Sequence, residues 1–126
     1  TFGLDFHEHA ANLANGCIDQ GDFERAVALH TRVVRLAPDA PMARNNLVVA
    51  LRAAGRPRDA VPHIRAAVAL APDAVRFRWM LADALLEAWA PPEVIEAELG
   101  EALAMAPEHA GLLALREELQ ARAADG

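Results

Sequence analysis

The chain has 126 residues, of which 54% are hydrophobic and few are aromatic, so it can bury the core of one domain and is not a disordered polymer. Its net charge is −6 and it contains no lysine, which argues against nucleic acid or an anionic membrane surface as a partner. No apolar run approaches the roughly 18 residues of a membrane span, and no signal peptide is visible.

The first third of the chain predicts two helices separated by a turn. The apolar residues of the first helix recur with helical spacing, at Ala10, Leu13, Ala14, Cys17 and Ile18. We expect Gly21 to end this helix in the left-handed conformation and Asp22 to cap the next one. The second apolar stripe comprises Phe23, Ala26, Val27, His30, Val33 and Val34. Pro38 should end this helix, and Asp39 should cap a third.

The end of the second helix recurs further along the chain. Residues 36–40, Leu-Ala-Pro-Asp-Ala, return unchanged at 70–74, and an altered form, Met-Ala-Pro-Glu-His, occupies 105–109. The first two copies are 34 residues apart, and a fixed period of this length predicts a stacked array of helix–turn–helix units. Laid in register, the units share apolar positions at Leu13, Leu47 and Leu81, and again at Cys17, Leu51 and Leu85.

This pattern resembles the tetratricopeptide repeat family, whose motif has a leucine and a small residue in the first helix, a turn glycine, an alanine and a final proline. The matching residues are Leu13, Leu47 and Leu81, then Gly21 and Gly55, Ala26 and Ala60, and Pro38, Pro72 and Pro107. The resemblance implies an all-α, right-handed α-solenoid of three helix–turn–helix repeats with a C-terminal capping helix. The implied boundaries are a lead-in over 1–6, repeats at 7–40, 41–74 and 75–110, and a capping helix and tail at 111–126.

The third unit departs from the other two. Trp89 stands in place of the turn glycine, Pro91-Pro92 lengthen the turn, and Ile95 replaces the small residue of the second helix. We therefore expect this helix pair to pack at a different angle or more widely. Arg44 and Arg78 occupy a position at which the family has a large residue, which should weaken the packing there.

One more helix is expected over residues 108–124. Its apolar stripe consists of Leu112, Leu115, Leu119 and Ala123. Arg116 stands where a further repeat of this family would have its leucine, so we interpret the segment as a capping helix that solvates the open end of the array. Phe6, in the lead-in, is expected to pack on the first helix.

Nothing in the sequence favours catalysis. The five histidines include no pair at the i, i+4 spacing of a helical zinc site, there is no cysteine pair, and the chain lacks serine altogether. Cys17 aligns with two leucines, which predicts a core residue rather than a nucleophile. The glutamates at 93, 96, 98 and 101 are expected on a solvated outer face. We predict no enzymatic activity, no cofactor and no metal.

In this family the first helix of each unit lines a concave groove. The resemblance therefore implies ligand-binding positions at Asn12, Asn15, Asn45, Asn46, Val49, Arg52, Arg76, Trp79, Met80 and Asp83. Asn12 and Asn46 occupy equivalent positions in consecutive units and resemble the asparagine ladder of O-linked N-acetylglucosamine transferases, because an amide can both donate to and accept from a peptide backbone. The alternative is that these asparagines are common family residues without a ligand, and that Trp79 packs between helices.

The same face partly resembles the carboxylate clamp of chaperone-binding family members, which hold Glu-Glu-Val-Asp tails. Asn15 and Asn46 match that clamp, and Arg76 substitutes for a lysine. Ala11 and Met80 replace its two remaining basic residues. A clamp without those cations should hold a C-terminal carboxylate poorly.

The sequence thus predicts a protein–protein interaction scaffold that binds an extended or helical peptide segment in the concave groove, with acidic groups of the ligand near Arg52 and Arg76. One alternative is a structural or self-association module, as a homo-oligomer or within a larger assembly. Another is an appendage of a longer polypeptide such as a glycosyltransferase, in keeping with a chain that begins at Thr1. A lone cysteine fits a reducing compartment, so we predict the cytoplasm, with the periplasm as the alternative.

Overall fold

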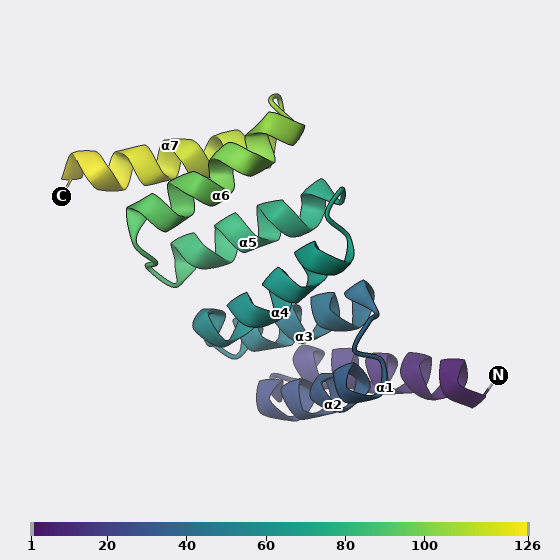
Figure 1. Cartoon of the computed structure of the whole chain (residues 1–126). Coiled ribbons are helices and arrows are strands. Elements are labelled where there is room, and N and C mark those ends of the chain that lie inside the picture. Colours follow the sequence, from purple (N-terminus) through teal and green to yellow (C-terminus); the bar gives the residue numbers. More distant parts are fainter. Residues whose placement is uncertain (1, 126) are drawn as a thin grey trace.

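The computed structural model describes the backbone of residues 2–125 and the side chains of residues 10 and 12–125. Over this range the chain forms seven helices and no strands. The helices are α1 (Phe2–Asp19), α2 (Phe23–Leu36), α3 (Pro41–Ala53), α4 (Pro57–Leu70), α5 (Val75–Glu87), α6 (Pro92–Met105) and α7 (Ala110–Asp125). They stack one upon the next from α1 to α7, as the all-α solenoid prediction requires (Figure 1).

The first helix is longer than expected. It begins at Phe2, so the backbone of the expected lead-in at 1–6 is, from residue 2 onward, continuous with α1. The expected packing of Phe6 lies outside the side chains that the structure describes. None of the helices in the described part of the chain is long and apolar enough to cross a membrane.

The turns within the three repeats lie along one edge of the stack, on the left in Figure 1, and share one backbone geometry. The φ angle is positive at Gly21 (81°) and Gly55 (75°), as predicted for the glycines, and also at Trp89 (56°). Each of these residues donates its N–H to the carbonyl three residues back, at 3.0–3.1 Å. The next residue donates to the carbonyl five residues back, which is the paired bonding of a Schellman cap.

The helix starts follow the sequence only in part. Asp22 caps α2, as predicted, by accepting a hydrogen bond from the Arg25 N–H at 3.4 Å. The prediction for Asp39 is wrong, because the N-cap residue of α3 is Ala40. No side chain accepts a hydrogen bond from the first N–H groups of this helix. Pro41 follows at the first helical position, where its missing N–H costs no hydrogen bond and its fixed φ favours the helix.

The shared leucine position is not equivalent in all three repeats. Leu47 and Leu81 are 1% and 2% exposed, whereas Leu13, predicted to lie in the core, is 42% exposed. In the described structure α3 and α5 pack both on the preceding helix and on their own partner. The first helix of the stack has no preceding helix there to cover Leu13.

Arg44 and Arg78, which are expected to weaken the packing, bond to the turns between repeats. The guanidinium of Arg44 donates to the Pro38 carbonyl at 3.4 Å and contacts His63 Nδ1 at 3.1 Å. Arg78 repeats the arrangement, donating to the Pro72 carbonyl at 3.1 Å. An arginine can satisfy a turn carbonyl while its stem covers apolar surface, so it replaces the large apolar residue at this position.

The third repeat is built more loosely, and α7 closes it. Helices α5 and α6 pack together less extensively than α3 and α4, and Ile95 of α6 is fully buried. The expected wider spacing of this helix pair stays a prediction. The last helix packs on both α5 and α6, burying Leu112, Leu115 and Leu119, while Ala123 is exposed. Its exposed surface carries the polar residues Arg116, Glu117, Glu118 and Gln120 beside several alanines. A polar outer surface over a buried stripe is what a capping helix needs.

Candidate functional site: the face of the first helices

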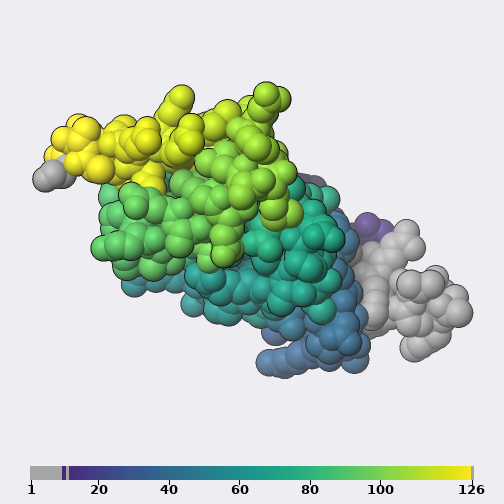
Figure 2. Space-filling view, turned by 45° about the horizontal axis from the view of Figure 1, so that its top comes forward, coloured from purple at the N-terminus to yellow at the C-terminus, as the bar shows by residue number. Residues whose placement is uncertain are grey.

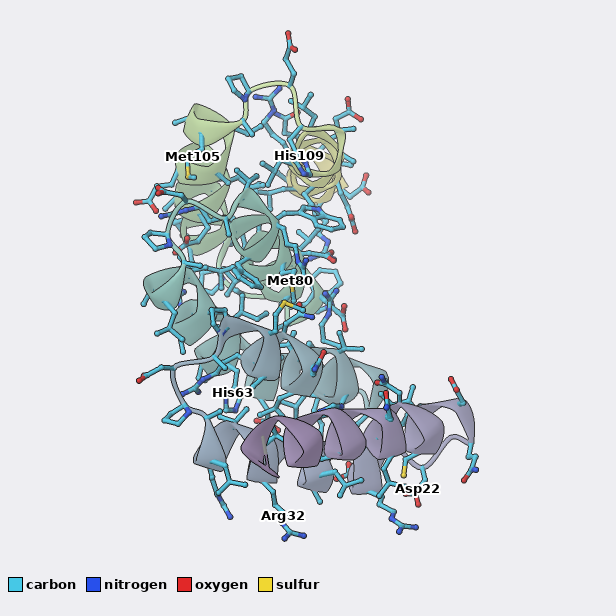
Figure 3. All side chains as sticks on the ribbon, turned by 90° about the vertical axis from the view of Figure 1, so that its right-hand side faces the viewer. Asp22, Arg32, His63, Met80, Met105 and His109 are labelled. Atoms are coloured by element: carbon cyan, nitrogen blue, oxygen red, sulfur yellow. The ribbon has the colours of Figure 1, made fainter. Side chains whose placement is uncertain are left out.

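The predicted binding residues all lie on α1, α3 and α5, the first helices of the three repeats. Figure 3 separates this face from the opposite one. Met80 of α5 and His109, just before α7, lie on one side of the stack, whereas His63 of α4 and Met105 of α6 lie on the other. Residues of α5 and of the segment just before α7 therefore lie on one face of the stack.

Arg52 joins α3 to α5 on this face. Its guanidinium donates to Asp83 at 2.8 Å and to Glu87 at 2.7 Å. Partial burial acts to lower the pKa of Arg52, but its hydrogen bonds to Glu87 and Asp83 and their negative charges outweigh this effect and raise the pKa, so the side chain stays charged. Two carboxylates on one guanidinium leave an excess of negative charge. Arg52 is thus neutralised within the fold, which revises the expectation that it attracts acidic groups of a ligand.

Arg76 is the cation of this face that remains exposed. Its guanidinium lies 3.4 Å from the Met42 sulfur of α3 and 5.4 Å from the centroid of the Phe77 ring. No carboxylate within the described part of the chain forms an ion pair with it. Arg76 and Met42 occupy equivalent positions in consecutive repeats, so their contact shows that equivalent side chains of α3 and α5 lie side by side.

Trp79 connects α5 to the start of α7. It remains 36% exposed, its ring centroid lies 5.8 Å from that of His109, and its indole edge lies against Gly111. A Cβ at Gly111 would come within 2.7 Å of the indole nitrogen, so only glycine allows this approach. His109 is held in turn, because its Nδ1 accepts the Leu112 N–H at 3.2 Å. Trp79 therefore both packs between helices and contributes to the exposed face.

The remaining predicted residues lie on the same helices with their side chains accessible. Val49 is 49% exposed, Asn12 and Asn15 are exposed, and Asn45, Asn46 and Met80 are half-buried. On this face the hydrogen bonds between described side chains are donated by Arg52 and Arg76. None of them involves the side-chain amide of Asn12, Asn15, Asn45 or Asn46. The ladder of Asn12 and Asn46 stays a prediction, since its amides are accessible but no ligand is bound to them.

The sequence reasoning missed Met42 as a partner of Arg76, and His109 and Gly111 as partners of Trp79. The first could have been found from the repeat, because Met42 and Arg76 are separated by one period of 34 residues. The other two could not, because the repeat period does not relate His109 or Gly111 to Trp79. Only the docking of α7 brings them to the groove.

The groups that could have suggested chemistry lie elsewhere. Cys17 is buried, which confirms the prediction of a core residue. His30 is 1% exposed, and burial lowers its pKa. Burial and the neighbouring charge of Arg44 lower the pKa of His63, which lies on the opposite face. Among the described residues no three histidine, cysteine or acidic side chains gather as a metal site would require.

The solved structures that share this architecture include two peptide-bound TPR domains and part of a glycosyltransferase. The second TPR domain of human RPAP3, in complex with the HSP70 peptide SGPTIEEVD, has a TM-score of 0.80 at 14% identity, covering 94% of this chain and 98% of that chain. The first TPR of Spaghetti (RPAP3), bound to the HSP90 peptide SRMEEVD, has a TM-score of 0.77 at 19% identity, covering 94% of both chains. The O-GlcNAc transferase of Thermobaculum terrenum has a TM-score of 0.67 at 25% identity, covering 86% of this chain and 21% of that chain.

No curated protein sequence is significantly similar to this one. A family model described as tetratricopeptide repeat does match, over residues 12–57 and 47–110. These ranges contain the helix pairs, the turn residues and the leucines from which the resemblance was argued. The chain belongs to the tetratricopeptide repeat family.

Proposed function

We propose that the face formed by α1, α3 and α5 binds an extended or helical peptide segment of a partner protein, without catalysis. The observation that carries the proposal is the arrangement around Arg52. Its bonds to Asp83 and Glu87 tie α3 to α5, while Met42, Val49 and Trp79 of the same two helices stay 36–50% exposed. A held backbone with exposed apolar anchors is suited to binding, since little order must be gained when the ligand arrives.

The charges along α5 favour one orientation of the ligand. Arg76, near the start of this helix, is exposed, whereas Asp83 and Glu87, near its end, outnumber the single cation that bonds to them. An acidic group of the ligand should therefore lie near Arg76. A neutral or basic group should lie near Asp83 and Glu87, because like charges repel across a groove.

We propose a ligand other than a C-terminal Glu-Glu-Val-Asp tail. The two RPAP3 domains above are bound to peptides that end in EEVD. In this chain Ala11 and Met80 stand at two of the basic positions of that clamp, so only Arg76 is left to pair with a terminal carboxylate. Exposed Met42 and Trp79 favour internal apolar residues of a ligand instead.

An appended binding module is the second candidate. It is supported by the likeness to the Thermobaculum terrenum O-GlcNAc transferase, which the chain matches over only 21% of that longer protein. The same groove would then serve a larger polypeptide, and catalysis would lie outside this sequence. In either case we propose a cytoplasmic setting, in keeping with the single unpaired Cys17.

Peptide display tests the groove. A random dodecapeptide library is selected on the immobilised protein, and the selected peptides are measured by fluorescence anisotropy. The variant Asn12→Ala with Asn46→Ala should weaken groove peptides by about one order of magnitude, since two hydrogen bonds are worth about 0.5–1.5 kcal/mol each. The outer-face variant Arg32→Ala with Arg35→Ala is the control, because Arg32 lies on α2 and points away from the stack (Figure 3). If only the control variant weakens binding, the groove is not the site.

Arg76→Ala tests the orientation of the ligand. It should weaken acidic peptides mainly at low salt, because exposed charges are screened over about 10 Å at 0.1 M ionic strength. Arg35→Ala removes an equally exposed arginine from α2 and should leave the affinity unchanged. Equal losses from the two variants would indicate a nonspecific charge effect rather than a site at Arg76.

A further inference from the structure

The turn between α5 and α6 carries a large apolar side chain that the fold does not bury. Trp89 is 71% exposed, more than any other large hydrophobic residue in the described part of the chain. The turn lies on the left in Figure 1, on the same side as the C-terminal end of α7. It belongs to the edge of the stack rather than to the face of α1, α3 and α5.

The backbone at Trp89 is unfavourable for a side chain. Its φ of 56° lies in the left-handed region, where the two equivalent turns have Gly21 and Gly55. A residue with a Cβ is strained there, and such strain persists where another requirement outweighs it. Glycine would satisfy the turn geometry equally well, as the first two repeats show. The tryptophan is therefore not explained by the turn itself.

The indole is held in place by α7. The guanidinium carbon of Arg122 lies 3.8 Å from the centroid of the Trp89 ring, close enough for a cation–π contact. Arg122 is fixed in turn by a 2.8 Å hydrogen bond to the Leu86 carbonyl and a 3.6 Å contact with Glu118. An exposed aromatic ring that is held by a fixed partner is preorganised for contact with another molecule.

A pocket of about 480 Å³ opens beside this ring. It lies between the α5–α6 turn and the C-terminal half of α7, which projects beyond the rest of the stack in Figure 2. Most of its lining is apolar, with contributions from Pro91, Pro92, Leu119 and Ala123, and with the buried Ile95 beneath. This space accommodates an aliphatic or aromatic side chain.

The charged side chains at the rim of the pocket determine which residues of a ligand can lie next to the apolar side chain that enters it. Glu96 lines the pocket and forms no ion pair within the described part of the chain, whereas Glu98 and Glu101 of the same helix pair with Arg65 and Arg78. The one cation of the lining, Arg122, already contacts Glu118 and the Trp89 ring. Arg116 lines the adjoining hollow together with Glu96 and forms no ion pair within the described part of the chain. With Glu93 at the start of α6 and Glu118 on α7, the acids Glu93, Glu96 and Glu118 still outnumber Arg116 and Arg122, so this end of the stack complements a basic group.

We propose that Trp89 and the adjoining pocket form a second binding site, distinct from the groove, for an apolar side chain flanked by lysine or arginine in a partner protein. The apolar side chain enters between Pro91, Pro92 and Leu119. The flanking cation lies near Glu96. This site can be occupied together with the groove, because the residues that line it come from the α5–α6 turn, α6 and α7.

Trp89→Gly is the decisive variant, because it inserts the residue that the equivalent turns use and removes the aromatic anchor without disturbing the backbone. The random dodecapeptide library is selected on the native chain and counter-selected on Trp89→Gly. Peptides that depend on Trp89 should carry an apolar residue beside lysine or arginine. Trp89→Gly should weaken them by about tenfold or more, as loss of an aromatic anchor does, with an unchanged or higher melting temperature.

Two further measurements locate the contact. Glu96→Gln should weaken the same peptides several-fold at low salt, whereas Glu117→Gln, an exposed acid on α7, should not. In a Trp79→Phe background Trp89 is the only tryptophan, so its fluorescence should shift when these peptides bind. The proposal is overturned if no selected peptide depends on Trp89. Enrichment of acidic peptides would also overturn it, because it would place the contact on the side of Trp89 lined by Arg58.

Discussion

The second and third repeats share a backbone plan but differ at the positions that set their spacing and their turn. Gly55 and Trp89 adopt the same left-handed turn with the same pair of hydrogen bonds. Ala60 and Ile95 are both fully buried at equivalent places in α4 and α6, yet α5 and α6 pack less extensively than α3 and α4. The fold thus accommodates a large residue at either position, and the same backbone bonds hold the turn in both repeats.

Removing α7 should have the largest effect, and it should fall on the third repeat alone. A chain that ends at Ala110 loses Leu112, Leu115 and Leu119, each of which contributes about 1.5–3 kcal/mol when buried. We expect a fall of several kcal/mol in unfolding free energy and self-association through the uncovered α5 and α6, measured by chemical denaturation and light scattering. A truncated chain that stays monomeric and equally stable would contradict the capping role of α7.

Exchanging the buried residues Ala60 of α4 and Ile95 of α6 tests whether each helix pair is packed around the side chain that it has at this position. Ile95→Ala should cost about 2–5 kcal/mol, because it leaves a cavity where the buried isoleucine packs. Ala60→Ile should cost about 1–3 kcal/mol, because α3 and α4 have no room for it. Denaturation of the two variants measures both values. If either substitution proves neutral, the spacing of that helix pair is not set by this residue.

Substitutions at the turn residues should change the unfolding free energy less, and the exchange should cost more at Gly55 than at Trp89. Gly55→Trp should destabilise the chain by about 1–2 kcal/mol, the cost of a left-handed residue with a Cβ. Trp89→Gly should change the unfolding free energy by less than about 1 kcal/mol, since the relieved strain offsets the loss of the contact with Arg122. Thermal unfolding of both variants provides the comparison. A large loss from Trp89→Gly would mean that the indole holds α7 in place.

The smallest effect should be a pH dependence of the unfolding free energy that comes from His30 of the first repeat. His30, Ile64 and Leu99 occupy equivalent buried positions, and only the histidine can be protonated. Burial lowers the pKa of His30 below its unfolded value of 6.5, so as the pH falls below 6.5 the unfolded state binds the proton first and stability decreases. The slope from one such group is at most about 1.4 kcal/mol per pH unit.

His30→Ile inserts the residue of the second repeat and removes the titrating group. The variant should show a flatter decline of unfolding free energy between pH 7 and pH 5 than the native chain. Because the Nε2 of His30 is buried without a hydrogen-bond partner in the described structure, the substitution should also be tolerated at neutral pH. An unchanged slope would assign the acid sensitivity to other groups.

The sequence alone determined the order of the helices, the repeat and most of the residues that they bury. These depend on local signals, namely apolar spacing, the glycines at 21 and 55, and prolines at fixed intervals, and each signal acts within one or two helical turns. The candidate groove followed from the same periodicity. The contact between Arg76 and Met42 could be expected on this basis, because a repeat places equivalent residues of consecutive units side by side.

Only the tertiary structure decided which of these side chains are accessible and what they bond to. Leu13 has the same sequence environment as Leu47, but it is exposed because burial depends on a neighbouring helix. Arg52 has the pattern of an exposed groove cation, but two carboxylates from the next repeat neutralise it. The pocket beside Trp89 arises where α7 leaves the repeat pattern and docks across α5 and α6. No local signal in the sequence encodes that contact, because it joins residues far apart in the chain.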